Sequence, residues 1–559
     1  MSSPPTDNAS NHDVDMYPVL TEQEIDRARP FGQLREARFG EILYRAGDVG
    51  VPCFILLSAT LEITQQSIQG ERLIAHILPG MFTGEAGLIA GQPVVAQARV
   101  VNGGTILAVQ PEELRTLVAR DATLSEILFR AFVLRRLMLI NRQLGNVVVV
   151  GSIHSADTLR IREFLGRNGY PHAYVDLDLD DTCRTFLDRF AIDVSEIPIV
   201  VCNGTMVLRN PSMAQLADCI GLNDNLGSDL LHDLIIVGAG PAGLAAAVYA
   251  ASEGLDTLLI EGHAPGGQAG TSSKIENYLG FPTGVSGQEL ATSAIRQTQK
   301  FGAKMALART IVRFRCTRRP YELEMDDGTV FSARTVVIAT GARYNKPTTV
   351  CLDRFAGCGV HYGATYIEAQ LCGGEEVIVV GGGNSAGQAA VFLSQTARKV
   401  YMLVRAANLA ESMSQYLVQR ITANPCIELL CNSELACLDG ESALNEVSWI
   451  NKETGRVRSL QAHHLFIMAG ASPNTAWLRG SVALDEKGFV LTGSDLPICI
   501  DSGGNASWPL SRPPHMLESS LPGVFAVGDV RAGSIKRVAT AVGEGATSVS
   551  LVHRALTEI

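Results

Sequence analysis

Two glycine clusters in this sequence have the spacing that binds the pyrophosphate of a dinucleotide. The first cluster is Gly238, Gly240 and Gly243, and it follows a short apolar run suited to a buried strand. The first glycine of such a motif permits a tight turn, the second lets the pyrophosphate approach the backbone, and the third lets the next helix pack closely. A helix beginning near Pro241 would direct its N–H groups at the phosphates. Glu261 ends the following apolar run, where a carboxylate can accept hydrogen bonds from a ribose hydroxyl.

The second cluster, Gly381 and Gly383 followed by Ala386, repeats the motif after another short apolar run. Asn384 and Ser385 are expected to begin its helix. We therefore expect a second dinucleotide to bind at this point of the chain.

The residue that follows the second motif differs in charge from Glu261. The same offset from the first glycine leads to Val404, with Arg405 next to it and then two alanines. Losing the acid and gaining an arginine is the change expected for a ribose 2′-phosphate, which a guanidinium can bind in bidentate fashion. We expect NADPH in preference to NADH, with Arg405 as the phosphate ligand.

Two Rossmann-like α/β units are needed to position these residues. Short apolar runs, each of a length typical of a buried strand, predict them. The expected strands are Leu234–Val237, Thr257–Ile260 and Val336–Ile338 for the first unit, Glu376–Val380 and Val400–Val404 for the second, and Phe525–Val527 where the chain returns to the first unit.

Three segments of this region resemble the FAD-binding segments of low-molecular-weight thioredoxin reductases. They are Glu261–Gln268, Ile275–Tyr278 and Phe525–Asp529, and the resemblance extends over 233–559. It implies an FAD domain made of 233–350 and 471–559, with an NAD(P)H domain at 351–470. It also implies that Asp529 contacts the ribityl chain and that the next helix points its N-terminus at the flavin, where it would favour negative charge. The further FAD ligands that it implies are Ala242, Gly267, Gln268, Asn277, Gly341, Gly528, Arg537 and Val538.

The redox dithiol of that family is missing from the corresponding segment. Thioredoxin reductases have C-A-T-C just before the nicotinamide-domain strand, whereas Gly363 and Tyr366 stand here in place of the two cysteines. Cys358 and Cys372 flank the segment without the family spacing, which makes them weak candidates for a replacement pair. Tyr366 is a weak candidate for stacking near the flavin.

Residues 17–145 resemble a cyclic-nucleotide-binding domain, because short β-rich runs alternate with glycine turns before a helical stretch. Glu85 matches the glutamate that holds the ribose in that family. The family's phosphate-binding arginine is replaced within Pro93–Ala96, so a cyclic phosphate would lack a charged partner. We expect a β-roll that does not bind cyclic nucleotides and that serves docking or dimerisation, with the apolar face of helix 123–143 available to a second copy.

Residues 146–221 resemble the thioredoxin/glutaredoxin fold, with a βαβ order and then a hairpin at Asn203-Gly204. Ile197-Pro198 takes the place of the family's cis-proline. The loop Gly151–Asp157, where the dithiol belongs, contains no cysteine, so it offers no thiolate for disulfide exchange.

The composition of the 559-residue chain disfavours several classes of protein. The formal net charge of −11 disfavours a general nucleic-acid binder. The sequence has no apolar run of about 18 residues, which predicts no membrane span. Its 12 cysteines are scattered, which fits free thiols in a reducing cytosol. We expect a cytoplasmic homodimer without a metal site, in which 1–16 form a disordered tail and 222–232 a linker.

These patterns predict an NADPH-dependent FAD oxidoreductase. Hydride would pass from NADPH to FAD, and electrons would then go to an unidentified acceptor such as a redox protein, a quinone or oxygen. Two alternatives stay open: a thioredoxin-disulfide reductase that uses non-standard thiols, and a non-catalytic flavin-based redox sensor.

Overall fold

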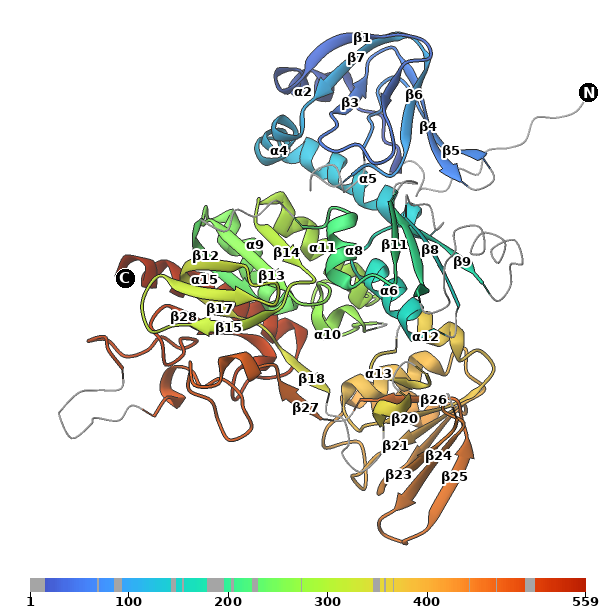
Figure 1. Ribbon diagram of the computed structural model, residues 1–559, viewed down its shortest axis with the longest axis vertical. Helices are drawn as coiled ribbons and strands as arrows, with labels where there is room; N and C mark the ends of the chain where they lie inside the picture. The colour runs from blue at the N-terminus through green and yellow to red at the C-terminus, as the bar shows by residue number, and fades with distance from the viewer. Residues whose placement is uncertain are drawn as a thin grey trace, which may run out of the picture. The chain divides into compact units, whose positions relative to one another are not determined.

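The structure, a computed structural model, describes 16–558 apart from 68–69, 85–92, 142–146, 153–154, 178–195, 203–205, 224–229, 273, 345–351, 356–357, 365, 442, 469 and 498–507. The chain divides into two compact units (Figure 1). The first consists of 1–153 and 164–223, and the second of 154–163 and 224–559.

The first unit begins with the predicted β-roll, built from two antiparallel sheets with the strand orders β1-β7-β3 and β2-β6-β4-β5. Its helix α5 contributes Leu124, Leu128 and Phe132 to the core, each no more than 1% exposed. This half of the helix is therefore covered by its own roll and is not the free dimer face that we expected. The elements are α2 Glu22–Ala28, β1 Gln33–Ala37, β2 Ile42–Tyr44, β3 Cys53–Leu56, β4 Thr60–Ser67, β5 Gly70–Ile77, β6 Gln97–Asn102, β7 Gly104–Val109, α4 Pro111–Arg120 and α5 Ala122–Asn141.

A four-stranded sheet of order β11-β10-β8-β9 follows the roll along the chain. β8 and β9 are parallel, and β10 is antiparallel to both β8 and β11. The Ile197-Pro198 bond is cis, and the helix predicted at Asp181–Phe190 lies outside the described residues. This order agrees with the predicted thioredoxin-like topology, which stays a prediction. The elements are β8 Val147–Gly151, α6 Ala156–Arg167, β9 His172–Asp176, β10 Ile199–Cys202, β11 Met206–Arg209 and α8 Met213–Cys219.

The second unit contains a seven-stranded sheet of order β14-β13-β12-β17-β16-β15, in which β28 also pairs with β17. β14, β13, β12, β17 and β28 are parallel to one another. β16 pairs antiparallel with β17, and β15 pairs antiparallel with β16. Strands buried on both faces read as continuous apolar runs, which is why the sequence revealed them. The elements are β12 Leu231–Val237, α9 Pro241–Ser252, β13 Thr257–Glu261, α10 Gly267–Gly270, α11 Gly287–Lys300, β14 Lys304–Leu307, β15 Ile311–Arg315, β16 Tyr321–Met325, β17 Val330–Ile338, β28 Val524–Ala526 and α15 Val538–Glu558.

A parallel five-stranded sheet of order β19-β26-β20-β21-β22 forms the second Rossmann-like layer, accompanied by the antiparallel sheet β23-β24-β25. Two further strands, β18 and β27, pair antiparallel where the chain leaves and re-enters the seven-stranded sheet. The elements are β18 Ala342–Tyr344, β19 Val360–His361, α12 Tyr366–Leu371, β20 Glu376–Val380, α13 Asn384–Leu393, β21 Lys399–Leu403, α14 Gln415–Ala423, β22 Ile427–Leu430, β23 Ser433–Asp439, β24 Glu446–Asn451, β25 Val457–Gln461, β26 His464–Ile467 and β27 Ala471–Pro473.

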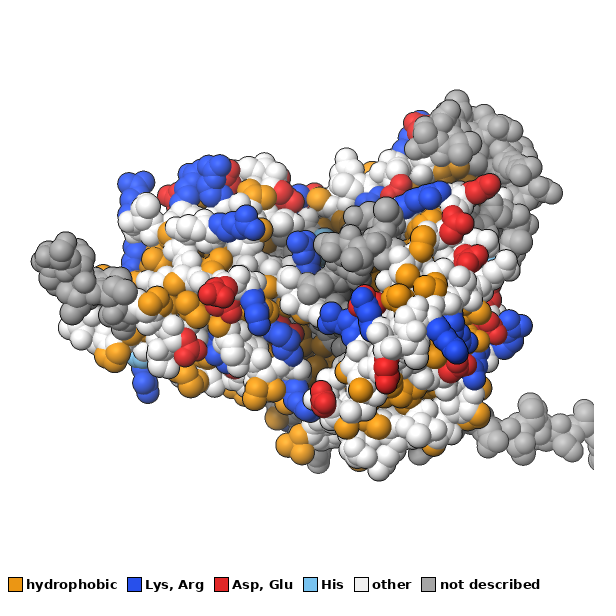
Figure 2. All heavy atoms as spheres, turned by 90° about the horizontal axis from the view of Figure 1, so that it is seen from below, with side chains coloured by type: hydrophobic (Ala, Val, Ile, Leu, Met, Phe, Trp, Pro, Cys, Tyr) orange, Lys and Arg blue, Asp and Glu red, His pale blue; other side chains and the backbone are white. Residues whose placement is uncertain are grey.

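The surface carries charge of both signs. Figure 2 shows Lys and Arg interspersed with Asp, Glu and apolar side chains on the face that it draws. Some large apolar side chains, such as Phe39 and Leu279, are exposed, which is common on protein surfaces and does not by itself mark a docking surface. None of the described helices combines the length and apolar character needed to cross a membrane.

Candidate dinucleotide-binding sites

The glycines after β12 differ in the space around them. Gly238 has φ +104°, and a Cβ atom built on it would lie 2.4 Å from the Ala339 carbonyl oxygen. A Cβ atom on Gly243 would lie 1.8 Å from the Gly238 carbonyl oxygen. By contrast, the nearest atom to a Cβ on Gly240 would be 3.9 Å away. Gly238 and Gly243 are therefore required by packing, while Gly240 borders open space at the N-terminus of α9.

A second glycine segment faces Gly240. The backbone of Gly267, with φ +55°, comes so close that a Cβ atom on it would lie 3.0 Å from the Gly240 Cα. The Gly266 N–H donates to the Ala239 carbonyl at 2.7 Å and fixes this approach. Gln268 donates from Nε2 to the Ala342 carbonyl. The structure thus brings two of the predicted glycines together as a side-chain-free cradle beside a helix N-terminus, the arrangement that suits a pyrophosphate.

Glu261 lies at the carboxyl end of β13, and its carboxylate is held by backbone N–H groups. Oε2 accepts from the Ala239 N–H at 2.7 Å, and Oε1 accepts from the His263 N–H at 2.9 Å. Each carboxylate oxygen can accept more than one hydrogen bond. Glu261 therefore keeps the capacity to accept from a ribose hydroxyl while its position is fixed next to the glycine motif.

The C-terminal segment joins the same site through the pairing of β28 with β17. Gly528, with φ +71°, approaches the start of α9 so closely that a Cβ atom on it would lie 3.0 Å from the Ala242 Cβ. Burial raises the pKa of the neighbouring Asp529, although the nearby Lys536 partly offsets this effect. Helix α15 then crosses α9, and a Cβ atom on Gly545 would lie 2.1 Å from the Ala242 carbonyl oxygen. The backbones of the two helices thus approach closely at Ala242.

The four remaining predicted FAD ligands occupy three kinds of position. Gly341 follows β17 with φ +63°, and its carbonyl accepts from the Asn474 N–H at 3.0 Å. Val538 begins α15, and the carbonyl of the preceding Arg537 accepts from the Ala541 N–H at 3.0 Å. Asn277 is exposed on a loop, and no hydrogen bond joins it to the glycine motif among the residues that the structure describes. Its assignment to the cofactor stays a prediction.

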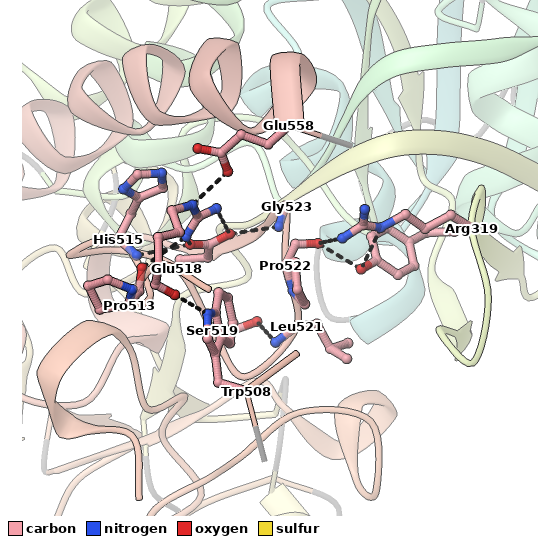
Figure 3. Close-up of polar contacts among 12 residues, drawn as sticks. Arg319, Trp508, Pro513, His515, Glu518, Ser519, Leu521, Pro522, Gly523 and Glu558 are labelled. Carbon is pink, nitrogen blue, oxygen red and sulfur yellow. Dashed lines mark hydrogen bonds and ion pairs between the residues drawn. The ribbon is translucent and has the colours of Figure 1, made fainter. Parts of the chain in front are cut away.

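A buried carboxylate network fixes the chain just before β28 (Figure 3). Glu518 is fully buried and accepts from Arg512 Nη1 at 2.7 Å and Nη2 at 3.1 Å. It also accepts from the N–H groups of His515 at 2.9 Å and Gly523 at 2.8 Å. Arg512 in turn donates to the partly exposed Glu558 at 2.6 Å. The strand that leads to Asp529 is therefore held by a bidentate, hydrogen-bonded ion pair.

The second glycine motif repeats this geometry after β20. Gly381 has φ +146°, and a Cβ atom on it would lie 2.5 Å from the Met468 carbonyl oxygen. Gly383 caps α13 in extended conformation, and a Cβ atom on it would have no described neighbour within 4 Å. Asn384 begins α13 and accepts at Oδ1 from the Ser414 N–H at 2.7 Å, while Ser385 is exposed. Open space again borders the glycine at the helix N-terminus.

Arg405 lies directly beyond the carboxyl end of β21. The preceding Val404 is 1% exposed and donates its N–H to the Leu430 carbonyl at 2.9 Å, which anchors the backbone. The Arg405 side chain is exposed and makes no hydrogen bond or ion pair within the described part of the chain. Its charge is therefore available to a phosphate.

The segment in which we predict the dithiol to be replaced follows β19. A Cβ atom on Gly363 would lie 3.7 Å from the Thr271 Cβ, so the position corresponding to the first family cysteine adjoins the segment after α10. Tyr366 begins α12, and its side chain lies outside the described residues. Cys358 and Cys372 are both free thiols. Cys372 is fully buried, and burial raises the pKa of its thiol to about 12, so it is not a thiolate at neutral pH.

Two pairs of polar residues lie near these sites, and the sequence alone did not indicate either pairing. Thr340 and Asn474 bind each other's backbone: the Thr340 hydroxyl donates to the Asn474 carbonyl and the Asn474 amide donates to the Thr340 carbonyl, both at 2.9 Å. His361 packs on His464 with a nitrogen–nitrogen distance of 3.1 Å, and burial lowers the pKa of His361 to about 3. His361 is therefore neutral at pH 7. Neither pair could be predicted from the spacing of residues along the chain, because each pair joins residues from distant parts of the sequence.

The described residues fit a flavin dinucleotide and a nicotinamide dinucleotide. Gly240 and Gly383 each stand at a helix N-terminus, where an added Cβ atom would meet no described atom closer than 3.9 Å. A carboxylate follows the first motif and an unpaired guanidinium follows the second, in keeping with a free ribose in one ligand and a 2′-phosphate in the other.

Comparison with known proteins identifies two families. The family described as pyridine nucleotide-disulphide oxidoreductase matches residues 232–545, more than half of the chain, and the cyclic nucleotide-binding domain matches residues 34–121. Thioredoxin reductase of Borreliella burgdorferi is 31% identical over 323 residues, which cover 57% of this chain and 90% of the relative. Thioredoxin reductase of Treponema pallidum is 33% identical over 316 residues, covering 56% and 94%.

Solved structures agree with this assignment. Thioredoxin reductase of Lactococcus lactis, in its FR conformation, is 27% identical with a TM-score of 0.52, covering 59% of this chain and 100% of that one. Thioredoxin reductase of T. acidophilum is 28% identical with a TM-score of 0.51, covering 58% and 99%. These neighbours confirm the predicted α/β fold class with Rossmann-like domains.

Proposed function

Because the chain belongs to the pyridine nucleotide-disulphide oxidoreductase family and is similar to thioredoxin reductases, we infer that it is an NAD(P)H-dependent flavoprotein oxidoreductase. From this premise we propose that it oxidises NADPH through FAD without a dithiol relay and delivers the electrons to an acceptor outside the chain. The observation that carries the proposal is the presence of Gly363 and Tyr366 at the positions of the family's two cysteines.

Bound FAD would supply the hydride acceptor and bound NADPH the hydride donor, so the protein's part is binding, orientation and electrostatics. The N-terminus of α9 and the Gly240–Gly267 cradle would hold the FAD pyrophosphate, and Glu261 its ribose. Gly383 and Arg405 would hold NADPH. The N-terminus of α15 would stabilise negative charge on the reduced cofactor. Hydride transfer itself requires no acidic or basic side chain.

The neighbouring cysteines do not support a replacement relay. Cys372 is buried with a raised pKa, and disulfide exchange needs a thiolate. Cys358 lies before β19 and is part-buried. We therefore infer that electrons leave the flavin directly for the acceptor, which would be a redox protein, a quinone or oxygen.

Changing Arg405 to alanine should weaken NADPH much more than NADH, because only NADPH carries the 2′-phosphate. A charged hydrogen bond is worth about 1.5–3 kcal/mol, so the KM for NADPH should rise about tenfold or more. Arg398→Ala is the matched control, because this exposed arginine stands at the opposite end of β21. An equal loss for both nucleotides would reject the assignment of Arg405.

The proposed electron path is tested by steady-state NADPH oxidation with thioredoxin or with ferricyanide as acceptor. Ferricyanide should support turnover and thioredoxin should not, in both the unmodified protein and a Cys358→Ser/Cys372→Ser variant. Fast thioredoxin reduction that disappears in the double variant would show instead that these cysteines form an unconventional relay. Failure of every acceptor, with flavin still reduced by NADPH, would favour a redox sensor.

A further inference from the structure

A cavity opens inside the β-roll, in the domain that matches the cyclic nucleotide-binding family. The cavity is partly open to solvent. Tyr44, Thr83, Gly84 and Arg135 contribute to its lining, and the other lining residues that the structure describes are largely apolar. The apolar lining residues are Ile63, Ile74, Ile77, Val94, Val95, Ala96, Met138 and Leu139, together with the ring of Tyr17.

Arg135 on helix α5 is the cationic residue in this lining, and it is only 5% exposed. Its Nε donates to the Met16 carbonyl at 2.9 Å, and its Nη1 donates to the carbonyls of Phe82 at 3.0 Å and Gly84 at 2.8 Å. The rings of Tyr17 and Phe82 lie over the guanidinium, each with its centroid 4.8 Å from Cζ. The group is therefore held rigidly in the cavity wall.

The positive charge of Arg135 has no counterion within the described residues, and its Nη2 is buried without a hydrogen-bond partner there. Burial lowers the pKa of Arg135. An unpaired buried charge is costly, and buried charges are normally paired. The fold tolerates this cost at a position that lines a cavity, where a ligand could supply the missing negative charge.

A cyclic nucleotide does not suit these walls. Val94 and Val95 are 6% and 2% exposed and line the cavity where the family has its phosphate-binding arginine. A purine and a sugar both need polar partners once water is removed, and most of this lining offers none. The walls favour a compact anion with an apolar body.

We propose that this cavity binds an apolar monocarboxylate, such as a medium-chain fatty acid, with its carboxylate near Arg135 and its chain against the apolar lining. The cationic group sits at one place in the wall, so a single head group is recognised. Charge-assisted hydrogen bonds are about twice as strong as neutral ones, and this difference would set the preference for an acid over its uncharged analogue.

Calorimetry on the full-length flavoprotein tests the proposal with three probes of the same chain length, octanoate, octanol and octylammonium. Cyclic AMP serves as a fourth probe. Octanoate should bind about tenfold or more tightly than octanol, because only the acid gains a charged partner. Octylammonium and cyclic AMP should not bind measurably. Equal affinity for octanoate and octanol, no binding of octanoate, or tighter binding of cyclic AMP would each overturn the proposal.

Three variants separate ligand recognition from folding. Arg135→Gln should abolish the preference for the acid, whereas Arg130→Gln, an exposed arginine on the same helix, should not. Because Arg135 also anchors three carbonyl groups, its loss could unfold the roll. Ala96→Leu therefore provides an independent test. It keeps Arg135, and its larger side chain would occupy part of the cavity that Ala96 lines. It should reduce octanoate affinity about tenfold while thermal unfolding shows a roll at least as stable. Unchanged octanoate affinity in a folded Ala96→Leu protein would place the ligand elsewhere.

Discussion

Replacing Gly240 with valine should give a folded protein that no longer retains flavin. Gly240 has φ −71° and ψ −177°, values that valine adopts readily, and a Cβ atom there would meet no atom closer than 3.9 Å. The new side chain would project beside the paired glycines Gly240 and Gly267, at the N-terminus of α9, where we expect the pyrophosphate to approach the backbone. The purified variant should lack the flavin absorbance band, while circular dichroism stays close to that of the unmodified protein.

Gly383→Val is the matched control, because it makes the same change in the second motif. A Cβ atom on Gly383 would meet no described atom within 4 Å, and its backbone is extended. This variant should keep its flavin but lose reduction of that flavin by NADPH. Full flavin content in Gly240→Val, or loss of flavin in Gly383→Val, would show that the two motifs are assigned to the wrong dinucleotides.

Replacing Glu518 with alanine should lower the free energy of unfolding by about 3–5 kcal/mol, the range for breaking a buried ion pair from one side. The variant would leave Arg512 without its bidentate partner and would leave the N–H groups of His515 and Gly523 without an acceptor. Because these groups precede β28, flavin content should fall with stability. Urea unfolding followed by flavin fluorescence measures both effects.

Glu558→Ala removes the other carboxylate that Arg512 contacts and serves as the control. The Glu558 side chain is 35% exposed and accepts a single hydrogen bond from Arg512. Exposed ion pairs contribute about 1 kcal/mol or less. Similar losses from Glu518→Ala and Glu558→Ala would mean that Arg512, rather than the buried carboxylate, determines the stability of this loop.

The sequence predicted the parts of the fold that depend on local pattern. Gly238 and Gly243 could be assigned because a tight turn and a close helix–strand approach require glycine, and the structure shows both contacts. The apolar run Leu234–Val237 matches most of β12, which spans Leu231–Val237. Central parallel strands carry this signal because both of their faces are buried.

Contacts between distant residues could not be predicted in the same way. Arg135 reads in the sequence as an ordinary polar residue on a helix, yet it is buried against Met16 and Phe82. Glu518 lies in a segment that the sequence indicates as an irregular Pro/Gly/Ser loop, yet it is fully buried. Burial of a charged side chain is decided by partners that tertiary structure brings to it, and spacing along the chain does not record them.

The pairing of β28 with β17 has a consequence for the order of folding. It joins Val336–Ile338 to Val524–Ala526, with the whole second Rossmann-like layer between them in sequence. Contacts of such long sequence separation form late, since the entropy of closing the intervening loop must be lost first. During synthesis the N-terminal parts of the chain emerge and fold earlier. The seven-stranded sheet can therefore be completed only after β28 has been synthesised. If α15 contributes to the flavin site as we propose, flavin uptake requires chains that have been translated into that helix as well.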